Sequence, residues 1–136
     1  MALRRVVVTG IGTINPLGHN ITEYFENLEK GVSAAAPITH FDATKFRSRF
    51  ACEVKDYDWT RYFERKEVRK YDLFAQFAMI SADEALKDAS IAGNDAIDLT
   101  RVGVVWGSGT GGTTTFYEES KGYIEGNYVN SSFLSR

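Results

Sequence analysis

Apolar residues recur at steps of three and four over the longest patterned stretch of the chain, from Lys66 to Ala89. This spacing is the helical period and predicts a helix. Phe77, Met79 and Ile80 lie outside the main apolar stripe and are apolar too. A helix that is apolar on nearly every side is buried between layers. The stretch therefore predicts one long buried helix around which the rest of the chain packs.

Two shorter stretches contain consecutive apolar residues instead of a helical spacing: Arg4 to Thr9 and Arg101 to Trp106. Such runs are typical of parallel strands that are covered on both faces. A strand, a long crossover and a second strand favour a right-handed parallel pair. The predicted fold class is therefore α/β, with a parallel sheet core packed against the long helix.

Shorter elements complete the prediction. A helix is expected from Glu23 to Lys30, with Thr22 as its N-cap and Gly31 just past its end. Three weaker elements are a strand near Phe50 to Val54, a helical turn over Asp58 to Glu64, and a helix from Thr113 to Gly122.

Composition narrows the classes of function. The 136 residues suit one domain, and a net charge of −2 argues against a nucleic-acid-binding module. The single cysteine, Cys52, excludes an internal disulfide and fits a reducing compartment. No apolar run approaches the roughly 18 residues of a membrane span, and the N-terminus lacks a signal-peptide pattern. We therefore expect a cytoplasmic protein that binds neither nucleic acid nor a membrane.

The glycines that follow the second apolar run allow two interpretations. Gly107, Gly109 and Gly112 match G-x-G-x-x-G, which favours a dinucleotide-binding α/β domain. The acidic residue expected about 20 positions later is missing from that region. Alternatively, the glycines let the backbone approach another backbone segment or a ligand closely.

Residues that could carry metal or nucleophilic chemistry are isolated. A reactive thiol needs a basic neighbour, whereas Glu53 beside Cys52 is acidic, so a structural cysteine is favoured. His19 and His40 have no partner at metal-ligand spacing. The residues alone therefore indicate no catalytic group, no metal site and no cofactor.

Four cations gather at the start of the predicted long helix: Arg65, Lys66, Arg69 and Lys70. Their i, i+4 spacing places them on neighbouring helix faces. Positive charge at a helix start opposes the macrodipole, and a docking patch for an anionic partner would explain this cost. A solvated surface run, balanced by nearby carboxylates, is the alternative.

Four segments resemble, in order and spacing, the N-terminal part of a β-ketoacyl-acyl-carrier-protein synthase, most closely the type II condensing enzymes of bacterial fatty acid synthesis. They are Arg4 to Gly18, Gly31 to Asp42, Arg65 to Ala89, and Arg101 to Gly112. The resemblance implies a thiolase-like fold, a homodimer and an acyltransferase. Such an enzyme condenses an acyl chain held on a cysteine with the malonyl thioester of acyl carrier protein and releases carbon dioxide.

The resemblance also implies roles for particular positions. Arg65, Lys66, Arg69 and Lys70 match the family's docking residues for the acidic carrier protein. Gly109 and Thr110 match the loop that lines the acyl pocket near the dimer interface. No cofactor is implied.

The family's catalytic cysteine, histidines and lysine lie downstream of everything that matches here, and Cys52, His19 and His40 do not correspond to them. We therefore expect no catalytic residue in this chain and no condensation by it alone. A non-catalytic carrier-protein-binding module remains an alternative function.

Two domain-level expectations follow from the resemblance. Residues 1–127 would form an incomplete thiolase-like half-fold, and residues 128–136 a divergent tail, with disorder, a truncation or a changed reading frame as interpretations. Without the family's later strands, the sheet would keep an open apolar edge, which recruits other chains. We therefore expect a weakly folded or self-associating chain.

Overall fold

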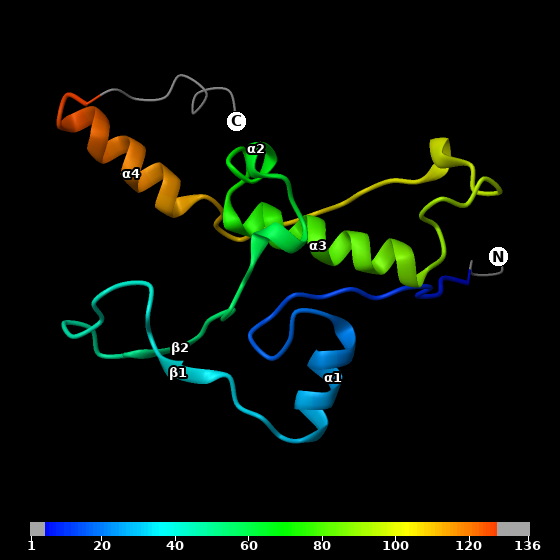
Figure 1. Cartoon of the computed structure of the whole chain (residues 1–136), viewed down its shortest axis with the longest axis horizontal. Coiled ribbons are helices and arrows are strands. Elements are labelled where there is room, and N and C mark those ends of the chain that lie inside the picture. Colours follow the sequence, from blue (N-terminus) through cyan, green and yellow to red (C-terminus); the bar gives the residue numbers. More distant parts are fainter. Residues whose placement is uncertain (1–4, 128–136) are drawn as a thin grey trace.

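One central helix organises the molecule (Figure 1). The computed structural model describes residues 5–127. The central helix is α3, Leu73–Asp88. On one side of it lie α1 (Ile21–Glu29), β1 (Ala35–Pro37) and β2 (Phe50–Cys52), and on the other lie α2 (Arg65–Val68) and α4 (Thr113–Ile124). Two short 3₁₀ turns are η1 (Trp59–Arg61) and η2 (Leu99–Arg101). Within residues 5–127, no helix has the length and apolar character needed to cross a membrane.

The helix predicted from Lys66 to Ala89 is in fact two helices, so the prediction of one long helix was wrong. The chain leaves the helical conformation after α2, and Asp72, the N-cap of α3, is extended, with φ −62° and ψ 157°. Aspartate favours such a start because its side chain competes with helical backbone bonds. The residues between the two helices are therefore a turn that sets α2 apart from α3.

The central helix is also less buried than its sequence predicts. Among its residues only Gln76 and Ile80 are buried, and Met79 is 43% exposed. An all-round apolar helix needs covering layers on all sides. The described chain therefore covers only part of the surface of α3.

The predicted parallel sheet does not form within residues 5–127. The described sheet is antiparallel and has two strands, β1 and β2, with Ala36 opposite Ala51. The runs expected as parallel strands are extended but unpaired, and Val6 and Val105 are 91% and 98% exposed. Arg4, the predicted start of the first strand, lies outside the described residues. An isolated strand pair is marginal in water, and stable sheets need further strands or a covering helix.

The shorter predicted elements agree more closely with the structure. Helix α1 starts slightly earlier than expected, because Asn20 rather than Thr22 is the N-cap, accepting a hydrogen bond of 2.9 Å from the backbone N–H of Glu23. Gly31 follows the helix with φ +66°, as a residue past a helix end often does. Strand β2, turn η1 and helix α4 all lie within or across the ranges predicted for them.

The N-terminal loop lies directly against α3. A Cβ atom on Gly10 or Gly12 would overlap the backbone of α3 at Ser81 and Ala85. Only glycine permits so close an approach of two backbones. The small residues of α3 and the glycines of the loop thus fit each other.

Two carboxylates of α3 fix this loop by accepting backbone hydrogen bonds. Asp88 accepts from the N–H of Ile11 at 2.9 Å. Glu84 accepts from the N–H groups of Thr13 and Ile21, both at 2.8 Å. Ile21 is the first residue of α1, so Glu84 satisfies an amide that the helix itself leaves unpaired. Glu84 therefore joins the loop and α1 to the central helix.

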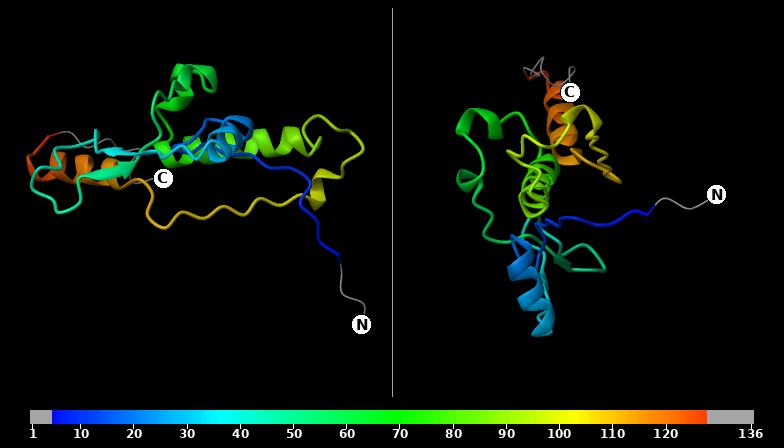
Figure 2. Two further views of the ribbon diagram at one scale, coloured as in Figure 1. Left: turned by 90° about the horizontal axis from the view of Figure 1, so that it is seen from below. Right: turned by 90° about the vertical axis from the view of Figure 1, so that its right-hand side faces the viewer.

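The second apolar segment is attached differently. Figure 2 (left) shows it running in an extended conformation along the length of α3. Its Trp106 lines a groove together with Ser81, Ala82 and Ala85 of α3. At its glycine-rich end, a Cβ on Gly111 would meet the ring of Phe74. The Thr115 hydroxyl of α4 then donates a hydrogen bond to the carboxylate of Asp72. The start of α4 is therefore anchored to the start of α3.

Candidate functional site

The cations singled out from the sequence form one exposed group, called here the basic cluster: Arg65, Lys66, Arg69 and Lys70. The first two lie in α2, the third is the C-cap of α2, and the fourth follows it. In the part of the chain that the structure describes, Arg65, Lys66 and Lys70 form no ion pair. Exposed positive charge without a partner attracts anionic molecules.

The turn after α2 changes the dipole argument for half of the cluster. Arg69 and Lys70 lie at the C-terminal end of α2, where positive charge is favourable. Helix α3 begins only at Leu73, beyond the whole cluster. The macrodipole argument therefore fails for Arg69 and Lys70 and remains for Arg65 and Lys66, which begin the four-residue helix α2. The support for a docking role comes from the exposure of the cluster and from the absence of ion pairs of Arg65, Lys66 and Lys70 among the described residues.

A buried amide that the sequence analysis missed lies between α2 and α3. Gln76, 7% exposed, is in the first turns of α3. Its Nε2 donates to the carbonyl oxygens of Tyr71 at 2.8 Å and Val68 at 3.4 Å. Its Oε1 accepts from the Tyr57 hydroxyl at 2.7 Å. The only signal in the sequence was a polar residue within an otherwise apolar part of the helix.

Tyr57, which donates to this amide, is kept protonated by its surroundings. Burial raises the pKa of Tyr57, and the neighbouring Tyr62 and Asp58 raise it further. The phenol therefore keeps the proton that it donates to Gln76. The pKa of Asp58 is lowered, first by the side-chain hydrogen bond from Thr60, then by the backbone N–H of the same residue. Asp58 caps η1 in this way and fixes the chain next to Tyr57.

A groove of about 510 Å³ separates the segment bearing the basic cluster from α3. One wall comes from η1, α2 and the residues between them, and the other from α3. Its lining residues are Arg61, Tyr62, Phe63, Glu67, Met79, Ile80, Asp83 and Lys87. The surface beside the cluster is therefore partly apolar and carries charges of both signs.

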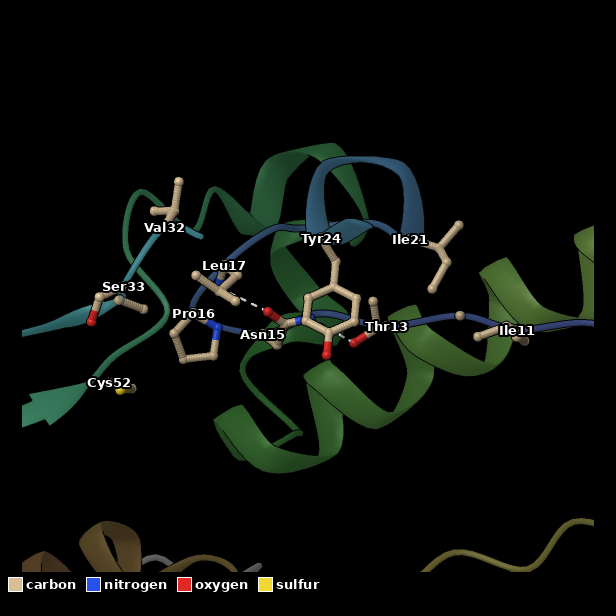
Figure 3. A pocket seen from close by; sticks show the side chains of 12 residues that line it. Ile11, Thr13, Asn15, Pro16, Leu17, Ile21, Tyr24, Val32, Ser33 and Cys52 are labelled. Atoms are coloured by element: carbon tan, nitrogen blue, oxygen red, sulfur yellow. Dashed lines mark hydrogen bonds between the residues drawn. The ribbon is translucent and has the colours of Figure 1, made fainter. Parts of the chain in front are cut away.

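A second groove, of about 690 Å³, lies between the N-terminal loop, α1 and the strand pair (Figure 3). Asn15 shapes its floor, because its side chain donates to the Thr13 hydroxyl at 2.9 Å and accepts from the N–H of Leu17 at 2.8 Å. Cys52 and Tyr24 are among the lining residues, which include no histidine, carboxylate or amine. A cysteine needs such a neighbour as a base. The groove is therefore an apolar surface without a nucleophile–base pair.

The loop residues predicted to line an acyl pocket are exposed. Thr110 faces solvent, and a Cβ on Gly109 would meet no described atom within 4 Å. The strand that a dinucleotide fingerprint requires before its first glycine is absent from residues 5–127, although α4 follows the loop. Gly109 and Thr110 therefore line neither of the two grooves described above, and they do not lie with the basic cluster.

The histidines take part in local backbone structure. His19 Nε2 lies 2.7 Å from the carbonyl oxygen of Lys55. Glu53 accepts from the N–H and hydroxyl of Thr39, at 3.1 and 2.7 Å, and lies 3.9 Å from His40. The Thr39 hydroxyl is the main cause that lowers the pKa of Glu53. Across the described residues, no three histidine, cysteine or acidic side chains are arranged to hold a metal.

Comparison with known proteins gives consistent results. The family described as beta-ketoacyl synthase, N-terminal domain, matches residues 3–134. The 3-oxoacyl-[acyl-carrier-protein] synthase 2 of Coxiella burnetii is 44% identical over 112 residues, 82% of this chain and 27% of that protein. The protein of the same name from Synechocystis is 40% identical over 109 residues, 80% of this chain and 26% of that protein. The chain therefore spans about a quarter of the length of these curated relatives.

Two solved structures are similar in fold as well as in sequence. The ishigamide ketosynthase/chain length factor aligns with a TM-score of 0.70 and 29% identity over 93% of this chain and 31% of that one. A beta-ketoacyl synthase from Burkholderia phymatum aligns with a TM-score of 0.72 and 27% identity over 92% of this chain and 31% of that one. The described arrangement of helices thus corresponds to part of a larger ketosynthase fold.

Proposed function

Because the chain belongs to the β-ketoacyl synthase family, through its N-terminal domain, we propose that it is the N-terminal portion of a 3-oxoacyl-[acyl-carrier-protein] synthase of fatty acid synthesis. The complete enzyme would be a cytoplasmic homodimer that condenses acyl and malonyl groups delivered by acyl carrier protein. The specific task of the described residues is to bind that carrier protein. Condensation itself would need groups that this chain alone does not supply.

The basic cluster is the observation that carries this proposal. Its residues are exposed, and Arg65, Lys66 and Lys70 have no ion-pair partner among the described residues. The names of the curated relatives state that they are synthases of 3-oxoacyl-[acyl-carrier-protein]. An acidic carrier protein complements this surface in charge. Complementary charges steer the two proteins together and fix their relative orientation.

The glycine-rich loop has a role in this proposal as well. Gly109 and Thr110 would line the acyl pocket once the rest of the enzyme and a second subunit cover them. Both are exposed in the described chain, which agrees with a loop whose covering surface is supplied from elsewhere. A threonine side chain here would then help to set how far an acyl chain can enter.

Charge reversal in the cluster tests the docking function. We expect saturable binding of acyl carrier protein to the full chain at low salt, measured by fluorescence titration. Lys66→Glu should weaken the affinity roughly tenfold, because it replaces attraction by repulsion at an interface of complementary charge. Raising the salt to about 1 M should weaken wild-type binding too, since the Debye length falls to about 3 Å.

Lys45→Glu is the matched control. Lys45 is exposed in the chain between β1 and β2, on the other side of α3 from α2 (Figure 1). The change in net charge is the same, so only position differs. Equal losses from the two substitutions, or no saturable binding by the wild type, would overturn the proposal.

A further inference from the structure

We propose that Gln76 is a positioning residue for carrier-protein docking: its buried amide sets how α2, and with it the basic cluster, is held against α3. The inference rests on the docking function proposed above and assigns it a structural determinant outside the cluster. Gln76 is itself buried and cannot touch a docked protein. It would act only through the backbone that it binds.

The first argument is that α2 is too short to hold itself. It has four residues, Arg65–Val68. Helices shorter than about 12 residues are marginal without tertiary contacts. The last carbonyl groups of any helix also lack partners within it. In this chain the Gln76 side chain donates to the carbonyl of Val68, the last residue of α2, and to that of Tyr71 in the following turn.

The second argument is that packing does not replace these hydrogen bonds. Helix α2 packs only loosely on α3. The groove of about 510 Å³ lies between α3 and the segment that runs from η1 into α2, with Phe63 and Glu67 on one wall and Met79 and Ile80 on the other. A helix that stands off across a groove depends on specific bonds for its orientation. The amide of Gln76 supplies two of them.

The third argument is that Gln76 is itself fixed from two directions. Its backbone belongs to α3, and its Oε1 accepts from Tyr57. Tyr57 also packs edge-on against Phe77, with ring centroids 5.1 Å apart. The amide is therefore held at both ends: Oε1 accepts from Tyr57, and Nε2 donates to the carbonyls of Val68 and Tyr71. A docking surface held in one orientation loses less entropy on binding than a mobile one.

Two substitutions separate the two ends of the amide. Gln76→Met keeps the length of the side chain and removes its hydrogen bonds at both ends. Tyr57→Phe removes the bond to Oε1 and leaves the Nε2 donors to Val68 and Tyr71 in place. We expect Gln76→Met to weaken carrier-protein affinity about fivefold, since an α2 that is correctly placed only about a fifth of the time lowers the apparent affinity by that fraction. Tyr57→Phe should change the affinity less than twofold.

A double-mutant cycle with Lys66→Glu distinguishes positioning from general damage. If Gln76 acts through α2, its substitution should cost less in the Lys66→Glu background than the fivefold expected in the wild type, because one of the cations that it positions no longer contributes and the two losses are coupled. General destabilisation lowers the fraction of folded chain by one factor in both backgrounds. Additive losses would therefore overturn the inference.

Amide hydrogen exchange provides a readout that does not need the carrier protein. Gln76→Met should speed exchange of residues 65–71 and leave the amides of α1 unchanged, because only the local opening of α2 becomes easier. Equal acceleration in α1, or no change at residues 65–71, would overturn the inference. If exchange changes as expected but Lys66→Glu binds as well as the wild type, the docking function itself fails, and with it this role of Gln76.

Discussion

Two segments of this chain have nearly the same sequence pattern but differ in how they are attached to α3. Residues 5–18 and 101–112 each contain a run of apolar residues followed by a glycine-rich loop. In the first segment the loop is bound to α3 from Ile11 onwards. In the second the chain stays exposed until Gly111. An apolar run followed by a glycine-rich loop therefore does not decide whether a segment is attached to α3.

The difference comes from the surface that each segment meets. The first meets small residues and two carboxylates on α3, which accept its backbone N–H groups. For the second, a Cβ on Gly103, Gly107 or Gly109 would meet no described atom within 4 Å. In both segments the valines themselves are exposed, as Val6 and Val105 show. The N-terminal loop is held in place by hydrogen bonds from its backbone N–H groups to carboxylates of α3, and not by burial of its valines.

The largest effect should come from removing Glu84, the carboxylate that binds both the first segment, at Thr13, and the start of α1, at Ile21. We expect Glu84→Ala to lower the free energy of unfolding by about 2–4 kcal/mol. Two hydrogen bonds to a charged group are lost, each of which contributes about 1.5–3 kcal/mol, and their partial exposure reduces the sum. Urea unfolding followed by circular dichroism measures this. Asp83→Ala is the neighbouring control: Asp83 pairs only with Lys87 at the surface, and its loss should cost less than about 0.5 kcal/mol.

A pair of glycine substitutions contrasts the two segments directly. Gly12→Ala places a Cβ against the backbone of α3 and should cost about 1–3 kcal/mol, as overpacking generally does. Gly103→Ala meets open space and should be neutral or stabilising by up to about 0.5 kcal/mol, since it restricts the unfolded chain. Equal thermal shifts for the two variants would show that the first loop is not in close contact with α3.

The smallest effect should appear where the second segment finally becomes attached. Thr115→Val keeps the shape of the side chain and removes the hydrogen bond to Asp72. We expect a loss of about 1.5 kcal/mol in the free energy of unfolding, the lower end of the range for a hydrogen bond to a charged group. Thr114→Val, at an exposed position of the same helix, controls for the change in helix propensity. A larger loss for Thr114 than for Thr115 would contradict the anchoring role of this bond.

Elements with local signals were predictable from the sequence. Helices α1 and α4 and strand β2 lie close to their predicted ranges, because caps, glycine stops and apolar spacing act within a few residues. The turn between α2 and α3 was not predicted. The apolar spacing continues across it, and the bond that stabilises it comes from Gln76, whose partners include Tyr57, 19 positions earlier.

The failed strand prediction has a related cause. A run such as Val6 to Val8 shows that a segment suits a covered strand, but the strand exists only when a partner lies beside it. The candidate site likewise has one part that the sequence could predict and one part that it could not. The charges of the basic cluster could be found from the sequence, whereas the amide that orients them and the groove beside them depend on contacts between distant segments.

The bond between Ile21 and Glu84 has a consequence for the order of events during protein synthesis. Its two residues are 63 positions apart. At 5–20 residues per second, a ribosome needs roughly 3–13 s to add that many residues. During this interval the first turn of α1 has no carboxylate to receive its amide, and contacts at such a separation also slow folding. Helix α1 is translated first, but it gains this stabilising hydrogen bond only after α3 has left the ribosome.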